Sequence, residues 1–314
     1  MLGIYSPGDA EQYAAWVRLL LQHEQVLIFR SLDEFSLERS QMDAVLVNWH
    51  VPFEFPVAWE RVKLVQAVSA GVDGLEAKHI PSHVQIARIV DVFSQSMAEY
   101  VLAHLLARSQ AVLPLMEAQR ARSWRPIETR CLAGRWLGVV GLGSVGSRIV
   151  RLAHAVGMRV RGYSRTGAQA ADLPLEGHVS AAPGALVEFV RGLHALVLAL
   201  PLTPETRHVV DRPVLASLGP AGLLINVGRG GVVNESVLVE MLASGELGGA
   251  ILDVFETEPV PPESPIWDLS NVTVTPHLSG PDDYEGVSRF FVENVHRLRN
   301  GEPLVGMVDR SRGY

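Results

Sequence analysis

The feature of this 314-residue sequence that most restricts its fold is a glycine-rich turn between an expected strand and an expected helix. An apolar run that starts at Trp136 leads directly into G-x-G-x-x-G, and a segment with helical apolar spacing follows. In such a turn Gly141 permits a tight bend, Gly143 lets the backbone approach a pyrophosphate, and Gly146 lets helix and strand pack closely. The pattern therefore predicts a strand-turn-helix unit that binds a dinucleotide.

Two parts of this expected site can be assigned to residues. The amides of Ser144 and Val145 lie at the helix N-terminus, where the helix dipole favours phosphate groups. The next expected strand leads into Ser164, Arg165 and Thr166, where an NAD-selective site carries a carboxylate for the ribose 2′-hydroxyl. Two hydroxyls and a guanidinium suit a 2′-phosphate instead, so we expect NADPH to be favoured over NADH. The alternative is that Arg165 is an ordinary solvated arginine.

Expected strands and helices alternate along the chain, which is typical of an α/β protein with parallel sheets. Strands are expected at 2–5, 26–29, 44–47, 64–67, 136–140, 159–163, 195–199, 223–227, 249–253 and 272–275. Helices are expected at 10–21, 96–122, 145–156 and 282–300. Pro114 should kink or interrupt the second of these helices.

Composition excludes several classes of protein. With 48% hydrophobic and 19% charged residues the chain is globular and long enough for two domains. A formal charge of −7 argues against nucleic acid and anionic membranes as partners. The apolar runs are far shorter than the roughly 20 residues that cross a bilayer. The single cysteine, Cys131, and a start without signal-peptide features predict a cytoplasmic protein.

A metal site is not expected. His79 and His83 have the spacing of paired ligands, but Pro81 between them disfavours the helix that would align the two rings. Cys131 has no second cysteine with which to form a thiolate zinc site.

Three polar residues follow the ends of later expected strands, where open parallel sheets bind ligands. Arg229, flanked by glycines, can grip a carboxylate and polarise an adjacent carbonyl group. His277 can give a proton to a carbonyl oxygen, and the carboxylate of Glu258 can hold the imidazole in place. Each residue alone could be an ordinary surface or loop residue. Their joint occurrence after the dinucleotide turn predicts a site for carbonyl reduction.

The sequence resembles the D-isomer-specific 2-hydroxyacid dehydrogenase family along nearly its whole length. The motifs in the family's order are 141–146 (GLGSVG), 200–206 (LPLTPET), 226–230 (NVGRG), 253–259 (DVFETEP) and 275–277 (TPH). The resemblance implies two doubly wound parallel-sheet α/β domains, with a Rossmann-type cofactor domain inserted into a flavodoxin-like substrate domain. The expected boundaries are 96–284 for the cofactor domain, and 1–95 with 285–314 for the substrate domain.

The resemblance also implies roles for single residues. Arg229 would bind and polarise a 2-oxoacid, His277 would be the acid/base, and Glu258 would tune His277. Asp253 would contact the nicotinamide carboxamide. Further cofactor contacts are expected from Leu200, Pro201, Thr206 and Val227.

Substrate contacts are implied for the first domain. Ser69, Ala70 and Gly71 match the family loop whose backbone amides receive the substrate carboxylate, and Trp49 is a further candidate. Catalysis is therefore expected in the cleft between the domains. A homodimer is also implied, with the helix around 99–106 and Trp124 as candidates for its interface.

Within the family, the sequence is most similar to bacterial glyoxylate/hydroxypyruvate reductases of the short type. The residues that carry this similarity are 48–52 (NWHVP), 163–165 (YSR), 262–267 (PESPIW) and the last 14 residues. The similarity implies an NADPH-preferring reductase of small 2-oxoacids that forms D-2-hydroxyacids. Two alternatives stay open. One is a reductase of a bulkier 2-oxoacid such as phenylpyruvate, and the other is a catalytically silent NAD(P)-sensing interaction protein.

Overall fold

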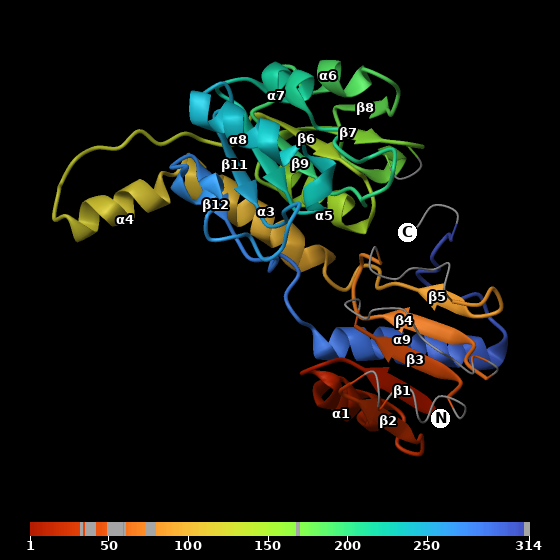
Figure 1. Ribbon diagram of the computed structural model, residues 1–314. Helices are drawn as coiled ribbons and strands as arrows, with labels where there is room; N and C mark the ends of the chain where they lie inside the picture. The colour runs from red at the N-terminus through yellow and green to blue at the C-terminus, as the bar shows by residue number, and fades with distance from the viewer. Residues whose placement is uncertain are drawn as a thin grey trace. The chain divides into compact units, whose positions relative to one another are not determined.

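The structure is a computed structural model that describes residues 1–31, 34, 42–48, 59, 61–72, 80–167 and 170–310. The chain forms two compact units, each built on one parallel sheet (Figure 1). Unit 1 consists of Met1–Phe93 and Asp282–Tyr314, and unit 2 of Ser94–Pro281. No helix within the described ranges has the length and apolar character needed to cross a membrane.

Unit 1 has a five-stranded parallel sheet with the order β2-β1-β3-β4-β5. Its strands are β1 (Leu2–Tyr5), β2 (Val26–Phe29), β3 (Ala44–Val47), β4 (Leu64–Ala67) and β5 (Gln85–Ala87). The order 2-1-3-4-5 is that of the flavodoxin-like fold. Helices α1 (Ala10–Leu20) and α9 (Tyr284–Asn300) pack against the sheet, and buried apolar residues of both helices and of the strands form one cluster. The last helix of the sequence therefore belongs to the unit formed by the first strands.

Unit 2 has a seven-stranded parallel sheet with the order β12-β11-β10-β9-β6-β7-β8. Its strands are β6 (Trp136–Val140), β7 (Arg159–Ser164), β8 (Gly177–Ser180), β9 (Ala195–Leu198), β10 (Leu223–Asn226), β11 (Gly249–Leu252) and β12 (Val272–Val274). Strand β6 lies at the point where the order reverses. With β6 counted as the first strand, the order is the Rossmann order 3-2-1-4-5-6 with a seventh strand added. Both sheets confirm the predicted fold class.

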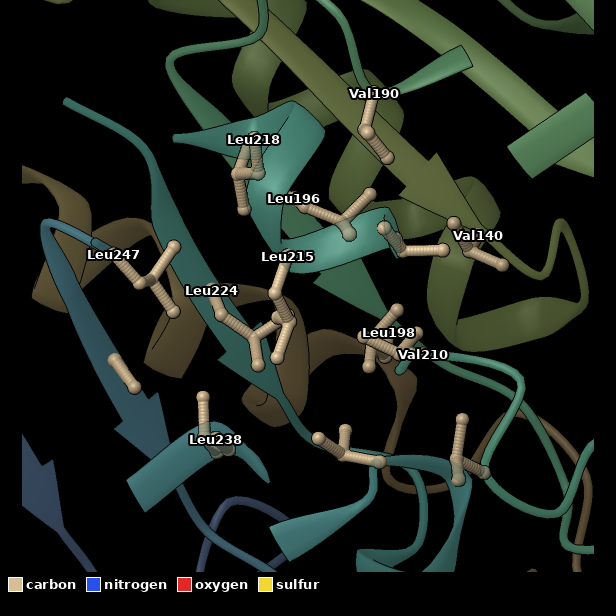
Figure 2. Packing of buried hydrophobic residues seen from close by; sticks show 14 of the residues in the cluster. Val140, Val190, Leu196, Leu198, Val210, Leu215, Leu218, Leu224, Leu238 and Leu247 are labelled. Atoms are coloured by element: carbon tan, nitrogen blue, oxygen red, sulfur yellow. The ribbon is translucent and has the colours of Figure 1, made fainter. Parts of the chain in front are cut away.

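Helices cover both faces of the sheet in unit 2. They are α3 (Ser94–Ser109), α5 (Ser144–Ala155), α6 (Ala185–Phe189), α7 (Arg212–Leu218) and α8 (Glu235–Ser244). Unit 2 also contains α4 (Val112–Arg120), which projects from the sheet (Figure 1), and the short 3-10 helices η3 (Ala170–Asp172), η4 (Gly230–Val232) and η5 (Pro265–Asp268). Alternate strand residues such as Leu196 and Leu224 pack towards α6, α7 and α8 (Figure 2). The intervening Val197 and Ile225 pack with α3 and α5. This burial explains why the strands are apolar at nearly every position.

The long helix expected over 96–122 is two helices, and the interruption comes before Pro114 instead of at it. Helix α3 ends at Ser109 and α4 begins at Val112, with Ala111 in the left-handed conformation at φ 51°. A continuous helix would force the Pro114 ring against the carbonyl group of Gln110. After the break, Pro114 lies in the first turn of α4, where its missing N–H costs no helix hydrogen bond.

Candidate functional site

The glycine-rich turn joins β6 to α5, and two of its glycines lie where no side chain fits. Gly141 has a φ of +93°, and a Cβ there would lie 2.5 Å from the carbonyl oxygen of Ala199. A Cβ on Gly146 would lie 1.8 Å from the carbonyl oxygen of Gly141. Gly143 differs, because a Cβ there would meet no atom within 4 Å. The turn is therefore closely packed on its inner side and open at Gly143.

The open side of the turn faces the start of α5. Gly143 is the N-cap residue of this helix and has no side chain that could accept a hydrogen bond from the first amides. These amides, among them those of Ser144 and Val145, carry partial positive charge from the helix dipole. Helix amides beside open space are what a pyrophosphate requires, so this part of the chain fits a dinucleotide.

A second part of the expected cofactor site lies where β7 ends. Ser164 is the last residue of the strand, and Arg165 and Thr166 follow in an exposed turn. Glu205, after β9, has a lowered pKa because of a hydrogen bond with Thr203, and the charge of Arg165 adds to the effect. The guanidinium of Arg165 is thus near enough to Glu205 to interact with its carboxylate.

The loop after β9 lies beside the glycine-rich turn. The Thr206 hydroxyl donates to the carbonyl oxygen of Pro201 at 2.7 Å and accepts from the amide of Thr203 at 2.8 Å. A Cβ on Gly228 would lie 2.7 Å from the carbonyl oxygen of Leu200, so this loop also touches the chain that follows β10. Val227 precedes Gly228 and is buried. The predicted cofactor residues on β6, β9 and β10 therefore lie at one edge of the sheet.

The structure brings His277 and Glu258 into direct contact. The Nδ1 atom of His277 lies 2.8 Å from Oε2 of Glu258, and Oε1 of Glu258 accepts from the amide of Phe255 at 2.8 Å. Burial acts to raise the pKa of Glu258, but the hydrogen bonds from His277 and Phe255 and the charge of Arg229 lower it overall. Glu258 therefore stays ionised and fixes Nδ1 as the protonated ring nitrogen. Nε2 is then the ring nitrogen that can exchange a proton with a ligand.

The loop that carries His277 is fastened by the fully buried carboxylate of Asp253. Its Oδ1 atom accepts from the Thr275 hydroxyl at 2.7 Å and the Leu278 amide at 2.9 Å. Its Oδ2 atom accepts from the Ser279 amide at 2.9 Å. The carboxylate is thus bonded to the chain on both sides of His277. A contact between Asp253 and a nicotinamide carboxamide stays a prediction.

Sequence reasoning missed Tyr100, which supports the same loop. The Tyr100 hydroxyl and Oγ1 of Thr275 are 2.6 Å apart. Burial raises the pKa of Tyr100 to about 12, so its hydroxyl stays neutral. No sequence pattern indicated this role, because a tyrosine among the apolar positions of a helix is typical of an ordinary core residue.

Arg229 lies beside this pair on the loop after β10. Its Nη1 atom donates to the carbonyl oxygen of Gly228 at 2.8 Å, and its own carbonyl accepts from the Asn226 side chain at 3.0 Å. A Cβ on Gly230 would lie 1.9 Å from the carbonyl carbon of Phe255, so the loops that carry Arg229 and Glu258 are in backbone contact. The structure therefore brings the three predicted catalytic side chains into one cluster.

The predicted substrate loop belongs to unit 1. The Ser69 hydroxyl donates to the carbonyl oxygen of Gly71 at 2.6 Å, and the Ile89 amide donates to the carbonyl oxygen of Ser69 at 3.0 Å. Ala70 is exposed at the tip of this turn. Trp49 lies outside the described residues. The substrate contacts of these four residues stay predictions.

Comparison with known proteins places this geometry among nucleotide-dependent dehydrogenases. Residues 102–279 match the D-isomer specific 2-hydroxyacid dehydrogenase, NAD binding domain. A glyoxylate/hydroxypyruvate reductase A from Klebsiella pneumoniae (strain 342) is 30% identical over 306 residues, which cover 95% of this chain and 96% of the relative.

Solved structures agree over the whole chain. A D-isomer specific 2-hydroxyacid dehydrogenase from Xanthobacter autotrophicus Py2, in complex with NADPH and MES, is 35% identical with a TM-score of 0.90, covering 100% of this chain and 99% of its own. An NADPH-dependent glyoxylate/hydroxypyruvate reductase from Sinorhizobium meliloti, in complex with NADP and sulfate, is 29% identical with a TM-score of 0.84 and the same coverage. The chain therefore belongs to the D-isomer-specific 2-hydroxyacid dehydrogenase family.

Proposed function

We propose that this protein reduces small 2-oxoacids of the glyoxylate and hydroxypyruvate type to D-2-hydroxyacids with NADPH. The observation that carries the proposal is the pair of His277 and Glu258 beside Arg229, at the carboxyl edge of a dinucleotide-binding sheet. The substrate class comes from the names of the relatives, which favour a small acid over phenylpyruvate. The complete acid/base pair argues against a silent nucleotide sensor.

Three side chains have different roles in the proposed reduction. Arg229 binds the substrate carboxylate and polarises the carbonyl group. His277 gives the proton on Nε2 to the carbonyl oxygen, which becomes the hydroxyl group of the product. Glu258 holds the ring by Nδ1 and stabilises its charged form. NADPH, when bound, supplies the hydride that the C2 carbon receives.

The cofactor assignment rests on two groups of residues in unit 2. The amides of Ser144 and Val145, beside the open space at Gly143, would hold the pyrophosphate. Ser164, Arg165 and Thr166 would hold the 2′-phosphate, and Leu200, Pro201, Thr206, Val227 and Asp253 would complete the cofactor site. Solved relatives in complex with NADPH or NADP support this choice, with NADH less favoured.

We assign the cofactor domain to unit 2 and the substrate domain to unit 1. Unit 2 contains the glycine-rich turn and the three proposed catalytic side chains. Unit 1 contains Ser69, Ala70 and Gly71, whose backbone amides we propose as ligands of the substrate carboxylate.

The helix around 99–106, one of the two candidates for a dimer interface, is part of α3. We propose a homodimer that forms through α4 and the chain that follows it, which includes the other candidate, Trp124. These residues project from the sheet of unit 2 and are drawn in yellow in Figure 1. Ala118 is the buried residue of α4, whereas Leu113, Leu115, Met116 and the later Trp124 are exposed. Exposed apolar side chains in one segment are typical of a surface that a partner covers.

The proposed setting is the cytoplasm. Cys131 is the single cysteine of the sequence, and its thiol is free and exposed. Because structural disulfides are typical of oxidising compartments, a chain without a second cysteine suits a reducing one. Fractionation of cells with compartment markers tests this location.

The proposed reaction predicts the effect of removing the acid. His277→Asn should lower kcat for glyoxylate by roughly 10²–10⁴-fold, because general acid catalysis is lost, while the Kd for NADPH stays within about twofold. The measurements are NADPH oxidation with glyoxylate, hydroxypyruvate, pyruvate and phenylpyruvate, and NADPH binding by fluorescence. His23→Asn, on an exposed turn of unit 1, is the control. Tight cofactor binding without turnover of any oxoacid by the unaltered protein would favour the sensor instead.

Glu258→Gln should shift the pH profile of reduction to lower pH. The contact with His277 favours ionised Glu258, and by reciprocity the carboxylate favours the charged imidazole. Glutamine carries no charge, so the reducing activity should be lost at a lower pH than in the unaltered enzyme. The measurement is kcat/KM for glyoxylate between about pH 5 and pH 9. Superimposable profiles would show that the charge of Glu258 has no part in the mechanism.

The cofactor proposal predicts a selectivity and its reversal. The enzyme should favour NADPH over NADH by roughly ten- to a hundredfold in kcat/KM, since tenfold requires only about 1.4 kcal/mol. Ser164→Asp together with Arg165→Ala should reverse the order, because it adds a ribose acceptor and removes the phosphate ligand. The assay needs fixed ionic strength, because salt screens the phosphate contact. Arg191→Ala, an exposed arginine at the opposite edge of the sheet, is the control. An unchanged ratio would make Arg165 an ordinary surface residue.

The dimer proposal predicts a change in mass. Leu113→Glu with Met116→Glu should convert the protein from dimer to monomer, because two charges would be buried in the apolar contact. The measurement is molar mass by light scattering during gel filtration. Leu19→Glu, at an exposed position of α1, should leave the mass unchanged. A monomeric unaltered protein would refute the proposal.

A further inference from the structure

One histidine next to the expected 2′-phosphate site belongs to no motif of the sequence. His178 lies on the edge strand β8, which pairs with β7 in parallel so that His178 is opposite Gly162. Ser164 lies two residues beyond Gly162 and therefore on the same face of the sheet. The Nε2 atom of His178 is 2.9 Å from the hydroxyl oxygen of Ser164.

The turn after β7 is shaped around this imidazole ring. Gly167 has a φ of +64°, and a Cβ there would lie 2.9 Å from Cε1 of His178. The amide of Gly167 donates to the hydroxyl oxygen of Ser164 at 3.2 Å. Glycine at 167 thus allows the backbone to lie against the ring and to reach the serine. The same turn carries Arg165 and Thr166, so the ring supports the segment that would meet the phosphate.

The hydrogen bonds of the Ser164 hydroxyl can be counted. A serine hydroxyl has one proton to donate and two lone pairs with which to accept. Gly167 uses one lone pair. When Nε2 of His178 carries a proton and donates to the second, both lone pairs are filled, and the hydroxyl proton must go to another acceptor. When Ser164 donates to His178 instead, no proton remains for a ligand.

A 2′-phosphate distinguishes between these two arrangements. An ionised phosphate accepts hydrogen bonds and donates none, whereas a ribose 2′-hydroxyl can do both. A serine that is compelled to donate therefore gains more from the phosphate. Arg165 lies in the turn that follows Ser164, so the donated hydroxyl proton would add a hydrogen bond to the charge of the guanidinium group.

We infer that His178 is a specificity-determining residue for the cofactor, which acts by holding the Ser164 hydroxyl as a donor to the 2′-phosphate. His178 is a positioning residue, because it acts through Ser164. The inference rests on the proposed use of NADPH and adds to it a residue on a different strand.

The test measures binding of two nucleotide fragments to the full-length protein by titration calorimetry. The probes are 2′,5′-ADP, which carries the additional phosphate, and 5′-AMP, which lacks it. His178→Leu removes the donor and should raise the Kd for 2′,5′-ADP by about five- to tenfold, which corresponds to the loss of one hydrogen bond. The Kd for 5′-AMP should change by less than about twofold. His178→Gln can still donate an N–H to Ser164 and should retain most of the preference.

The control is His154, an exposed histidine near the end of α5 in the same unit. His154→Leu should leave the Kd for both fragments unchanged. If His178 served only folding, His178→Leu would weaken the binding of both fragments equally, and that result would overturn the inference. An unaltered protein that binds 2′,5′-ADP no more tightly than 5′-AMP would overturn the proposed cofactor together with it. A protein that prefers 2′,5′-ADP, and keeps this preference in His178→Leu, would overturn the role of His178 alone.

Discussion

The buried carboxylate of Asp253 accepts hydrogen bonds from Thr275, Leu278 and Ser279, on both sides of the histidine in the proposed acid/base pair. A charge without exposure to water needs such donors, and their loss would cost more than one ordinary hydrogen bond. The bonds therefore fix the loop in one conformation. That conformation includes His277 at φ 53°, which an unrestrained chain seldom adopts. The contact between His277 and Glu258 thus depends on a charge that is itself buried behind the loop.

The glycine-rich turn and the loops after β10 and β11 depend on glycine, because a side chain at a few positions would overlap the neighbouring backbone. Gly141 and Gly146 let β6 and α5 approach until backbone atoms touch. Gly230 does the same for the loops after β10 and β11, where a Cβ would overlap the backbone of Phe255. Because close packing tolerates so little change in volume, these contacts also restrict the positions of Arg229 and Glu258.

How much the sequence revealed depended on burial. Strands with apolar residues on both faces, such as β9 and β10, were predicted to within a residue. The edge strands β5 and β8 were missed, because both are short, and the glycine, histidine, valine and serine of β8 are only partly buried or exposed. Catalytic candidates could be grouped, because the carboxyl ends of parallel strands share an edge. The contact of His178 with Ser164 could not be predicted, since it requires the pairing of a strand that the sequence did not indicate.

The order of strands separates the two functions that we assign to unit 2, which are catalysis and recognition of the ribose end of the cofactor. The proposed catalytic side chains follow β10, β11 and β12, whereas the residues at the ribose end follow or lie on β7 and β8. Strands β9 and β6 lie between the two groups, and strands are about 4.8 Å apart in a sheet. A substitution on β8 therefore has no short path of contacts to the acid/base pair. Cofactor choice can change at β8 while the Asp253 network that positions His277 stays intact, because β6, β9 and β10 lie in the sheet between the hydrogen bonds of His178 and Ser164 and those of Asp253.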